Sequence, residues 1–152
     1  MCDIPVDIGD RELIVRGILD IHLDKKGKLK SNAFRPKANT DDVSVMRHDY
    51  MGSDACKVTA RGLAHGTIEY RGLAVLLASE VRRAGSQVTD SREGNYCGHA
   101  HISHGIVVPP DEPVPSEQTL RLDERLRELR ITARYYADPE PPKDAWTGPT
   151  LS

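Results

Sequence analysis

The chain has 152 residues, of which 38% are hydrophobic and 29% charged, and its formal net charge is −2. This length supports one domain rather than two, and without an excess of positive charge a nucleic-acid-binding function is not favoured. No stretch is apolar over the ~18 residues that a membrane helix needs, and the acidic start "MCDIPVDIGD" lacks the basic region of a signal peptide.

The cysteines also bear on where the protein works. Cys2, Cys56 and Cys97 are odd in number and lack the spacing of a disulfide framework. Such a pattern is more typical of reduced thiols in the cytoplasm than of a disulfide scaffold. We therefore expect a cytoplasmic protein with reduced cysteines.

Short strands are predicted for the first part of the chain. Residues 10–18, "DRELIVRGI", fit a strand better than the alternative short helix, because the run contains Gly17 and two β-branched residues. Residues 21–34 predict a hairpin in which Gly27 can take the positive φ of the turn. The β-branched run over residues 43–47, "VSVMR", predicts a further strand.

Two helices are predicted further along. Residues 73–85 favour a central helix that packs on a sheet, with one apolar face and a glycine stop at Gly85. A longer amphipathic helix is predicted over residues 116–136, capped by Ser116. Its apolar stripe consists of Leu122, Leu126, Leu129, Ala133 and Tyr136. This stripe can pack on the protein's own sheet, or on a protein partner or a second copy of the chain.

These elements predict an α+β fold with a small mixed β-sheet, one central packing helix and a long amphipathic C-terminal helix. The expected organisation is a flexible N-terminus (1–9), a core domain (10–108), a Pro-rich connector (109–115), the amphipathic helix (116–136) and a flexible Pro-rich tail (137–152).

The stretch "NYCGHAHISHG" is the first candidate site. If it forms a strand, Cys97, His99 and His101 share one face, whereas His104 points to the other. Imidazole and thiolate groups are zinc ligands, so His99 and His101 are candidates for a zinc or acid–base site. Cys97 could instead act as a nucleophile beside a histidine. The simpler alternative is a strand whose histidines are structural and hydrogen-bonded.

A second candidate site consists of basic and hydroxyl side chains near predicted strand ends: Arg16, Arg35, Lys37, Ser44 and Arg47. Such groups can hold a phosphate, although solvated surface arginines are the simpler interpretation. The order of "LIVRG", "NAF" and "VSV" is similar to the arginine and serine-centred strand of ADP-ribosyltransferases. That resemblance implies NAD binding through Arg16 and Ser44, with the required glutamate at Glu69 or Glu80.

The segments "GKLKSNAFRP", "DDVSVMRHDY", "VRRAGSQV" and "GHAHISHG" together resemble a group of short bacterial proteins known mainly as hypothetical, over roughly residues 10–108. The resemblance implies a single bacterial cytosolic domain. In that group the position before the histidines tends toward Asn-Pro, where this chain has Tyr96-Cys97-Gly98, so the resemblance counts against a shared role for Cys97.

The sequence as a whole favours a small cytosolic binding or accessory protein that acts through a protein partner. The alternatives are an enzyme centred on His99 and His101, and an ADP-ribosyltransferase-like domain.

Overall fold

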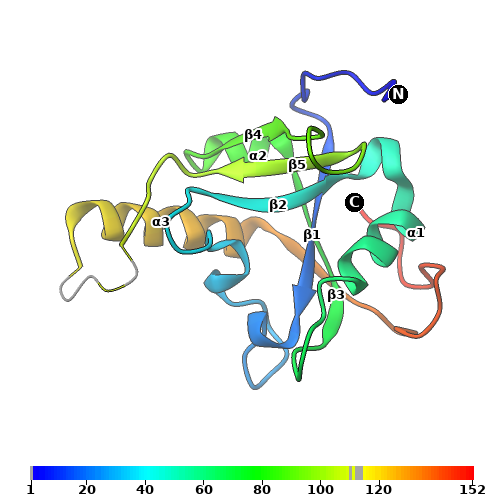
Figure 1. Ribbon diagram of the computed structural model, residues 1–152. Helices are drawn as coiled ribbons and strands as arrows, with labels where there is room; N and C mark the ends of the chain where they lie inside the picture. Colours follow the sequence, from blue (N-terminus) through cyan, green and yellow to red (C-terminus); the bar gives the residue numbers. More distant parts are fainter. Residues whose placement is uncertain (1, 110, 112–114) are drawn as a thin grey trace.

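The computed structural model describes residues 2–109, 111 and 115–152. These residues form one six-stranded sheet in the order β4-β5-β2-β1-β3-β6, with helices on both faces (Figure 1). The strands are β1 (Leu13–Leu19), β2 (Asp42–Arg47), β3 (Tyr70–Leu77), β4 (Gln87–Asp90), β5 (His99–Ser103) and β6 (Arg134–Ala137). The helices are α1 (His48–Arg61), α2 (Ala78–Arg83) and α3 (Glu117–Thr132), with the 3-10 turns η1 (Asp20–His22) and η2 (Ser31–Phe34).

The α+β class is as predicted, but the sheet is not mixed. Every strand pair in the described part of the chain is antiparallel. Short connections join most of these strands, and antiparallel neighbours need only short connections.

The sheet has an apolar core on each face. Ile14 and Ile18 of β1 belong to the core that also contains the leucines of α3, whereas Leu13 and Val15 belong to the core on the α1 side. A strand that is buried on both faces loses the alternation of apolar and polar residues. For this reason β1 and β3 read as nearly continuous apolar runs.

The predicted helix over residues 73–85 is wrong in its first half. Leu73, Leu76 and Leu77 lie in β3, and only residues 78–83 are helical. A short continuous apolar run fits a fully buried strand as well as a helix, and periodicity cannot separate the two. The predicted end is close to the observed one, since Gly85 follows the helix with a φ of +98°.

The C-terminal helix is shorter than predicted. Ser116 caps α3 by accepting a hydrogen bond from the Thr119 backbone N–H at 3.2 Å. The helix ends at Thr132, and Tyr136 lies in β6 rather than on the helix, so its assignment to a partner-binding helix is wrong. Much of the predicted Pro-rich connector, at positions 110 and 112–114, lies outside the described residues.

The C-terminal segment after β6 lies along α1 rather than extending into solvent. The Lys57 ammonium is fully buried, pairs with Asp138 at 3.0 Å and donates to the carbonyl oxygens of Glu140 and Ala145. Leu151 is buried in the core on the α1 side. The expected flexible tail is therefore packed against the domain by side chains from α1.

Two glycines permit the closest approaches in the fold. A Cβ on Gly17 would lie 2.7 Å from the Cβ of Ala60, so a side chain there would push α1 away from β1. A Cβ on Gly72 would lie 2.2 Å from the backbone oxygen of Tyr136, so β6 pairs with β3 only because this position is glycine.

Candidate functional site

The site begins where β1 and β2 separate. These strands pair only at Ile14–Arg47 and Val15–Met46, and beyond that point they diverge (Figure 1). Arg16 spans the gap, donating from Nε to the Ala33 carbonyl at 2.9 Å and from Nη1 to the Ser44 carbonyl at 3.0 Å. A cavity of about 420 Å³ opens beside Arg16, and we call it the β1–β2 cavity.

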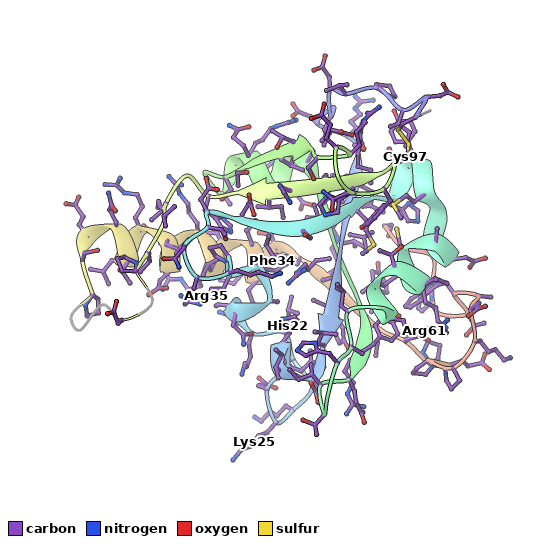
Figure 2. The ribbon with its side chains drawn as sticks, viewed as in Figure 1. His22, Lys25, Phe34, Arg35, Arg61 and Cys97 are labelled. Carbon is purple, nitrogen blue, oxygen red and sulfur yellow. A yellow bond between two sulfur atoms is a disulfide. The ribbon has the colours of Figure 1, made fainter. Side chains whose placement is uncertain are left out.

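The lining of the β1–β2 cavity is mostly basic. Its polar side chains are those of Arg16, His22, Arg35, Lys37, Thr40, Asp42, Ser44, His65 and His101, and its apolar ones are Leu19, Val43 and Leu63. Permanent positive charges therefore outnumber the single carboxylate, and the cavity has the electrostatic character of an anion site. Figure 2 shows Phe34, Arg35 and His22 beside the lower half of β1.

Arg16 carries a charge that the described residues do not neutralise. Both of its hydrogen bonds go to backbone carbonyls, and no ion pair within the described ranges involves it. Burial alone lowers its pKa to about 10. A buried guanidinium without a carboxylate is costly, and an anion in the cavity would offset that cost.

His22 presents a fixed hydrogen-bond donor to the same cavity. Its side chain is only 6% exposed, and its Nδ1 accepts the Leu19 backbone N–H at 3.0 Å. Burial, with the Arg16 charge nearby, lowers the His22 pKa to about 4. The ring is therefore neutral at pH 7, and the proton must sit on Nε2 because Nδ1 is the acceptor.

His99 and His101 lie side by side on one face of β5, as strand alternation predicts. Their ring centroids are 5.0 Å apart. His101 lines the β1–β2 cavity, with its Nδ1 3.5 Å from Asp42 Oδ2. His99 is buried, and its Nδ1 contacts the Ser91 hydroxyl and the Ser91 carbonyl. Burial lowers the His99 pKa.

The zinc hypothesis gains no ligand set from the structure. Within residues 2–109, 111 and 115–152, no three histidine, cysteine, aspartate or glutamate side chains are grouped so that they could hold a metal ion. His104 is far from the pair, because it faces the α3 side, where Nδ1 contacts the Ser86 hydroxyl at 2.7 Å and Nε2 contacts the Phe34 carbonyl at 2.9 Å. It is a structural histidine.

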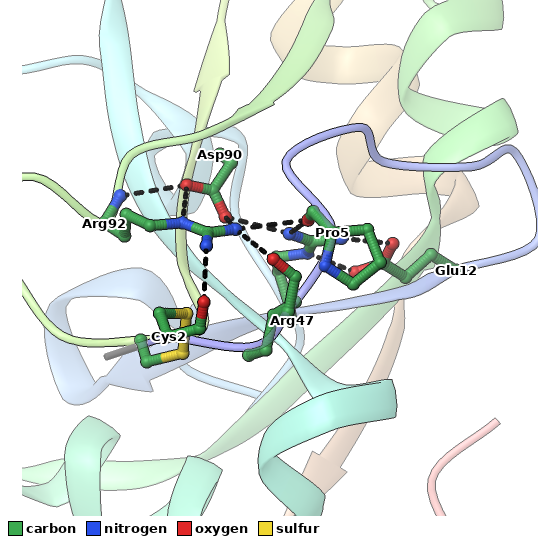
Figure 3. The surroundings of a disulfide bond; sticks show 8 residues. Cys2, Pro5, Glu12, Arg47, Asp90 and Arg92 are labelled. Atoms are coloured by element: carbon green, nitrogen blue, oxygen red, sulfur yellow. Dashed lines mark hydrogen bonds and ion pairs between the residues drawn. A yellow bond between two sulfur atoms is a disulfide. The ribbon is translucent and has the colours of Figure 1, made fainter.

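The expectation of reduced thiols is wrong for two of the three cysteines. Cys2 and Cys97 form a disulfide across 95 residues of sequence (Figure 3). Cys97 therefore has no thiolate to offer as ligand or nucleophile. Cys56 is free but buried, and burial raises its pKa to about 12, so this thiol is not reactive.

Arg47 belongs to a buried network rather than to an anion site. Its guanidinium is fully buried and contacts Glu12 Oε2 at 3.0 Å and Asp90 Oδ2 at 2.8 Å (Figure 3). Two carboxylates already neutralise its charge, which leaves nothing for a ligand. Hydrogen bonds from Arg92, and a further one from Arg47, lower the Asp90 pKa to about 2.

The same network holds the N-terminal segment that was expected to be flexible. Arg47 donates to the carbonyl oxygens of Pro5 and Asp7, and Arg92 donates to that of Ile4 at 2.7 Å. Together with the disulfide, these bonds fix residues 2–8 against the ends of β2 and β4.

The structure thus brings together one part of each predicted site. Arg16, Arg35, Lys37, Ser44 and His101 all line the β1–β2 cavity, whereas Arg47, Cys97, His99 and His104 do not. His22, Thr40, Asp42 and His65 also line it, and the sequence analysis missed them. His22 follows β1 directly, and its place at a strand end is the one signal that could have marked it.

The glutamate of the ADP-ribosyltransferase resemblance is missing from the cavity. Glu69 pairs with Arg71 on the surface, and Glu80 bonds Arg134 and the Leu77 backbone N–H. Neither lines the β1–β2 cavity, so the arrangement lacks the carboxylate that this resemblance requires.

Comparison of the chain with known protein families, with curated proteins and with solved structures finds no match in any of the three. None of the helices in the described part of the chain is long and apolar enough to cross a membrane.

Proposed function

We propose that this protein binds a phosphate-bearing small molecule in the β1–β2 cavity. The single observation that carries the proposal is Arg16, a buried guanidinium that backbone carbonyls orient but that no carboxylate of the described residues neutralises. Nε and Nη1 are used by those carbonyls, so the remaining Nη2 is the group that can donate to a ligand. A charge-assisted bond to a phosphate is among the stronger hydrogen bonds in proteins.

The neighbouring groups suit the same ligand. The neutral His22 ring offers an Nε2–H donor. Arg35 pairs with Asp123 at 3.1 Å, but both side chains are 48% exposed. Exposed pairs of this kind contribute little to stability, so Arg35 can exchange Asp123 for a ligand at small cost. The cavity volume of about 420 Å³ falls in the range of ligand pockets, about 300–1,000 Å³.

This proposal keeps the predicted class of binding protein but changes its ligand. A partner on the leucine stripe of α3 is not part of it, because Leu122, Leu126 and Leu129 are buried in the protein's own core. The cytoplasmic location also stays a prediction. The Cys2–Cys97 disulfide argues for an oxidising compartment instead.

Titration calorimetry with inorganic phosphate and pyrophosphate, in a low-salt buffer free of phosphate, tests the proposal. We expect Arg16→Gln to weaken binding by about tenfold or more, the range for a lost bond to a charged group. Arg121→Gln is the matched control, because Arg121 is an exposed arginine of α3 that pairs only with Glu117 among the described residues. Thermal unfolding of both variants checks that each is folded.

Two results would contradict the proposal. One is wild-type protein that binds neither anion at millimolar concentration. The other is a folded Arg16→Gln variant with the same affinity as the Arg121→Gln control.

A further inference from the structure

A second hollow adjoins the β1–β2 cavity along β2 and β5. Its volume is about 220 Å³, and Met46, Thr59, Asn95, Tyr96 and His99 are among the residues that line it. We call it the Tyr96 hollow. Ser44 and Leu63 line both spaces, so the two are compartments of one longer groove.

The strand register explains why the two compartments differ in chemistry. In the β2–β5 pair, Ser44 lies opposite His101 and Met46 lies opposite His99. Residues two apart on a strand point to the same face. A step of two residues along both strands therefore leads from the charged compartment to one with an apolar and aromatic lining.

Three rings run along this groove. The Tyr96 and His99 centroids are 5.1 Å apart, and those of His99 and His101 are 5.0 Å apart, each pair edge to face. His101 stands in the basic compartment. At the other end Tyr96 is 37% exposed, so part of its ring is open to a ligand. Aromatic side chains of this kind form the platforms on which nucleobases stack.

We propose that the ligand is a nucleotide, with its phosphate beside Arg16 and His22 and its base in the Tyr96 hollow. This inference rests on the proposed function, because it assigns the anion end of the ligand to the β1–β2 cavity. The ribose would lie between, over Ser44, where the two compartments meet. The Tyr96 hollow alone is smaller than a usual ligand pocket of about 300 Å³ or more, which fits one ring system rather than a whole ligand.

The test compares three probes on the full chain by titration calorimetry: inorganic phosphate, ribose 5-phosphate and adenosine 5′-monophosphate. We expect the nucleotide to bind about tenfold tighter than ribose 5-phosphate, the size of effect that base stacking gives. Tyr96→Ala should abolish that preference and leave the affinity for ribose 5-phosphate unchanged. Tyr96→Phe keeps the ring and should keep the preference. Tyr50→Ala, at an exposed tyrosine of α1 outside both compartments, is the matched control.

The outcomes separate this inference from the proposed function. If nucleotide and ribose 5-phosphate bind equally to the wild type, the nucleotide assignment is overturned while phosphate binding stands. A nucleotide preference that survives in Tyr96→Ala also overturns it, since the base then lies elsewhere. If none of the three probes binds, both proposals fail.

Discussion

Loss of the Cys2–Cys97 disulfide should lower the free energy of unfolding by several kcal/mol. The bridge closes a loop of 95 residues. The chain-entropy relation, −2.1 − 1.5R ln n, then gives a contribution of about 4.7 kcal/mol at 25 °C. That figure concerns the unfolded chain only. The hydrogen bonds of Arg47 and Arg92 to residues 2–8 do not depend on the bridge, so the N-terminal segment should stay in place after reduction.

Urea unfolding followed by the fluorescence of Trp146, the sole tryptophan, measures the effect. We expect Cys2→Ala, Cys97→Ala and the double variant to be destabilised equally, by about 3–5 kcal/mol, because each removes the same bond. Their m-values should rise, since an unbridged chain exposes more surface on unfolding. Thiol titration in denaturant gives an independent count. Untreated wild type should show a single reactive thiol, that of Cys56. Three thiols, or single variants as stable as wild type, would refute the reasoning.

The other predictions concern the buried network, the sheet and acid sensitivity. Asp90→Asn should cost about 3 kcal/mol in urea unfolding, because it removes one of the carboxylates that neutralise the fully buried Arg47; an unchanged midpoint would contradict the network. Gly72→Ala should cost about 2 kcal/mol, since its Cβ would lie 2.2 Å from a β6 carbonyl oxygen, whereas Gly9→Ala, with nothing within 4 Å, should be nearly neutral. Because burial lowers the His22 pKa from 6.5 to about 4, the unfolded chain takes up this proton first as the pH falls. The stabilisation is then complete above pH 6.5 and is lost as the pH falls toward 4, and His22→Asn should flatten this part of the profile of unfolding free energy against pH.

The sequence allowed those parts of the fold to be predicted in which local pattern and burial agree. The β-branched run of β2 and the capped, periodic α3 are of this kind, because one stripe or face is apolar and the rest is polar. The segment 73–77 is different. It lies in a central strand covered on both faces, so every residue is apolar and the pattern carries no period. Only the packing of α1 and α3 on opposite faces decides that it is a strand.

The candidate site was predictable in part for a related reason. Arg16, Arg35 and Ser44 were identified because basic and hydroxyl groups near strand ends often bind ligands. That Arg47 would be neutralised while Arg16 would not depends on Glu12 and Asp90, which the fold brings to Arg47 from 35 and 43 positions away. The disulfide was missed for the same reason, since 95 residues separate its cysteines. Pairings over such distances are set by the sheet order and leave no local pattern.

The outer strands of the sheet have a consequence for how the protein behaves at high concentration. β4 and β6 occupy the two edges, and each is only four residues long. An exposed edge is a template on which another chain can add a strand, and short edge strands are one of the means by which proteins prevent this. A neighbouring molecule would gain few backbone hydrogen bonds at either edge, and Pro139 follows β6 closely, where a proline cannot donate to a strand added there. Continuation of the sheet from one molecule to the next is therefore disfavoured, and crowded molecules should remain separate rather than form fibrils.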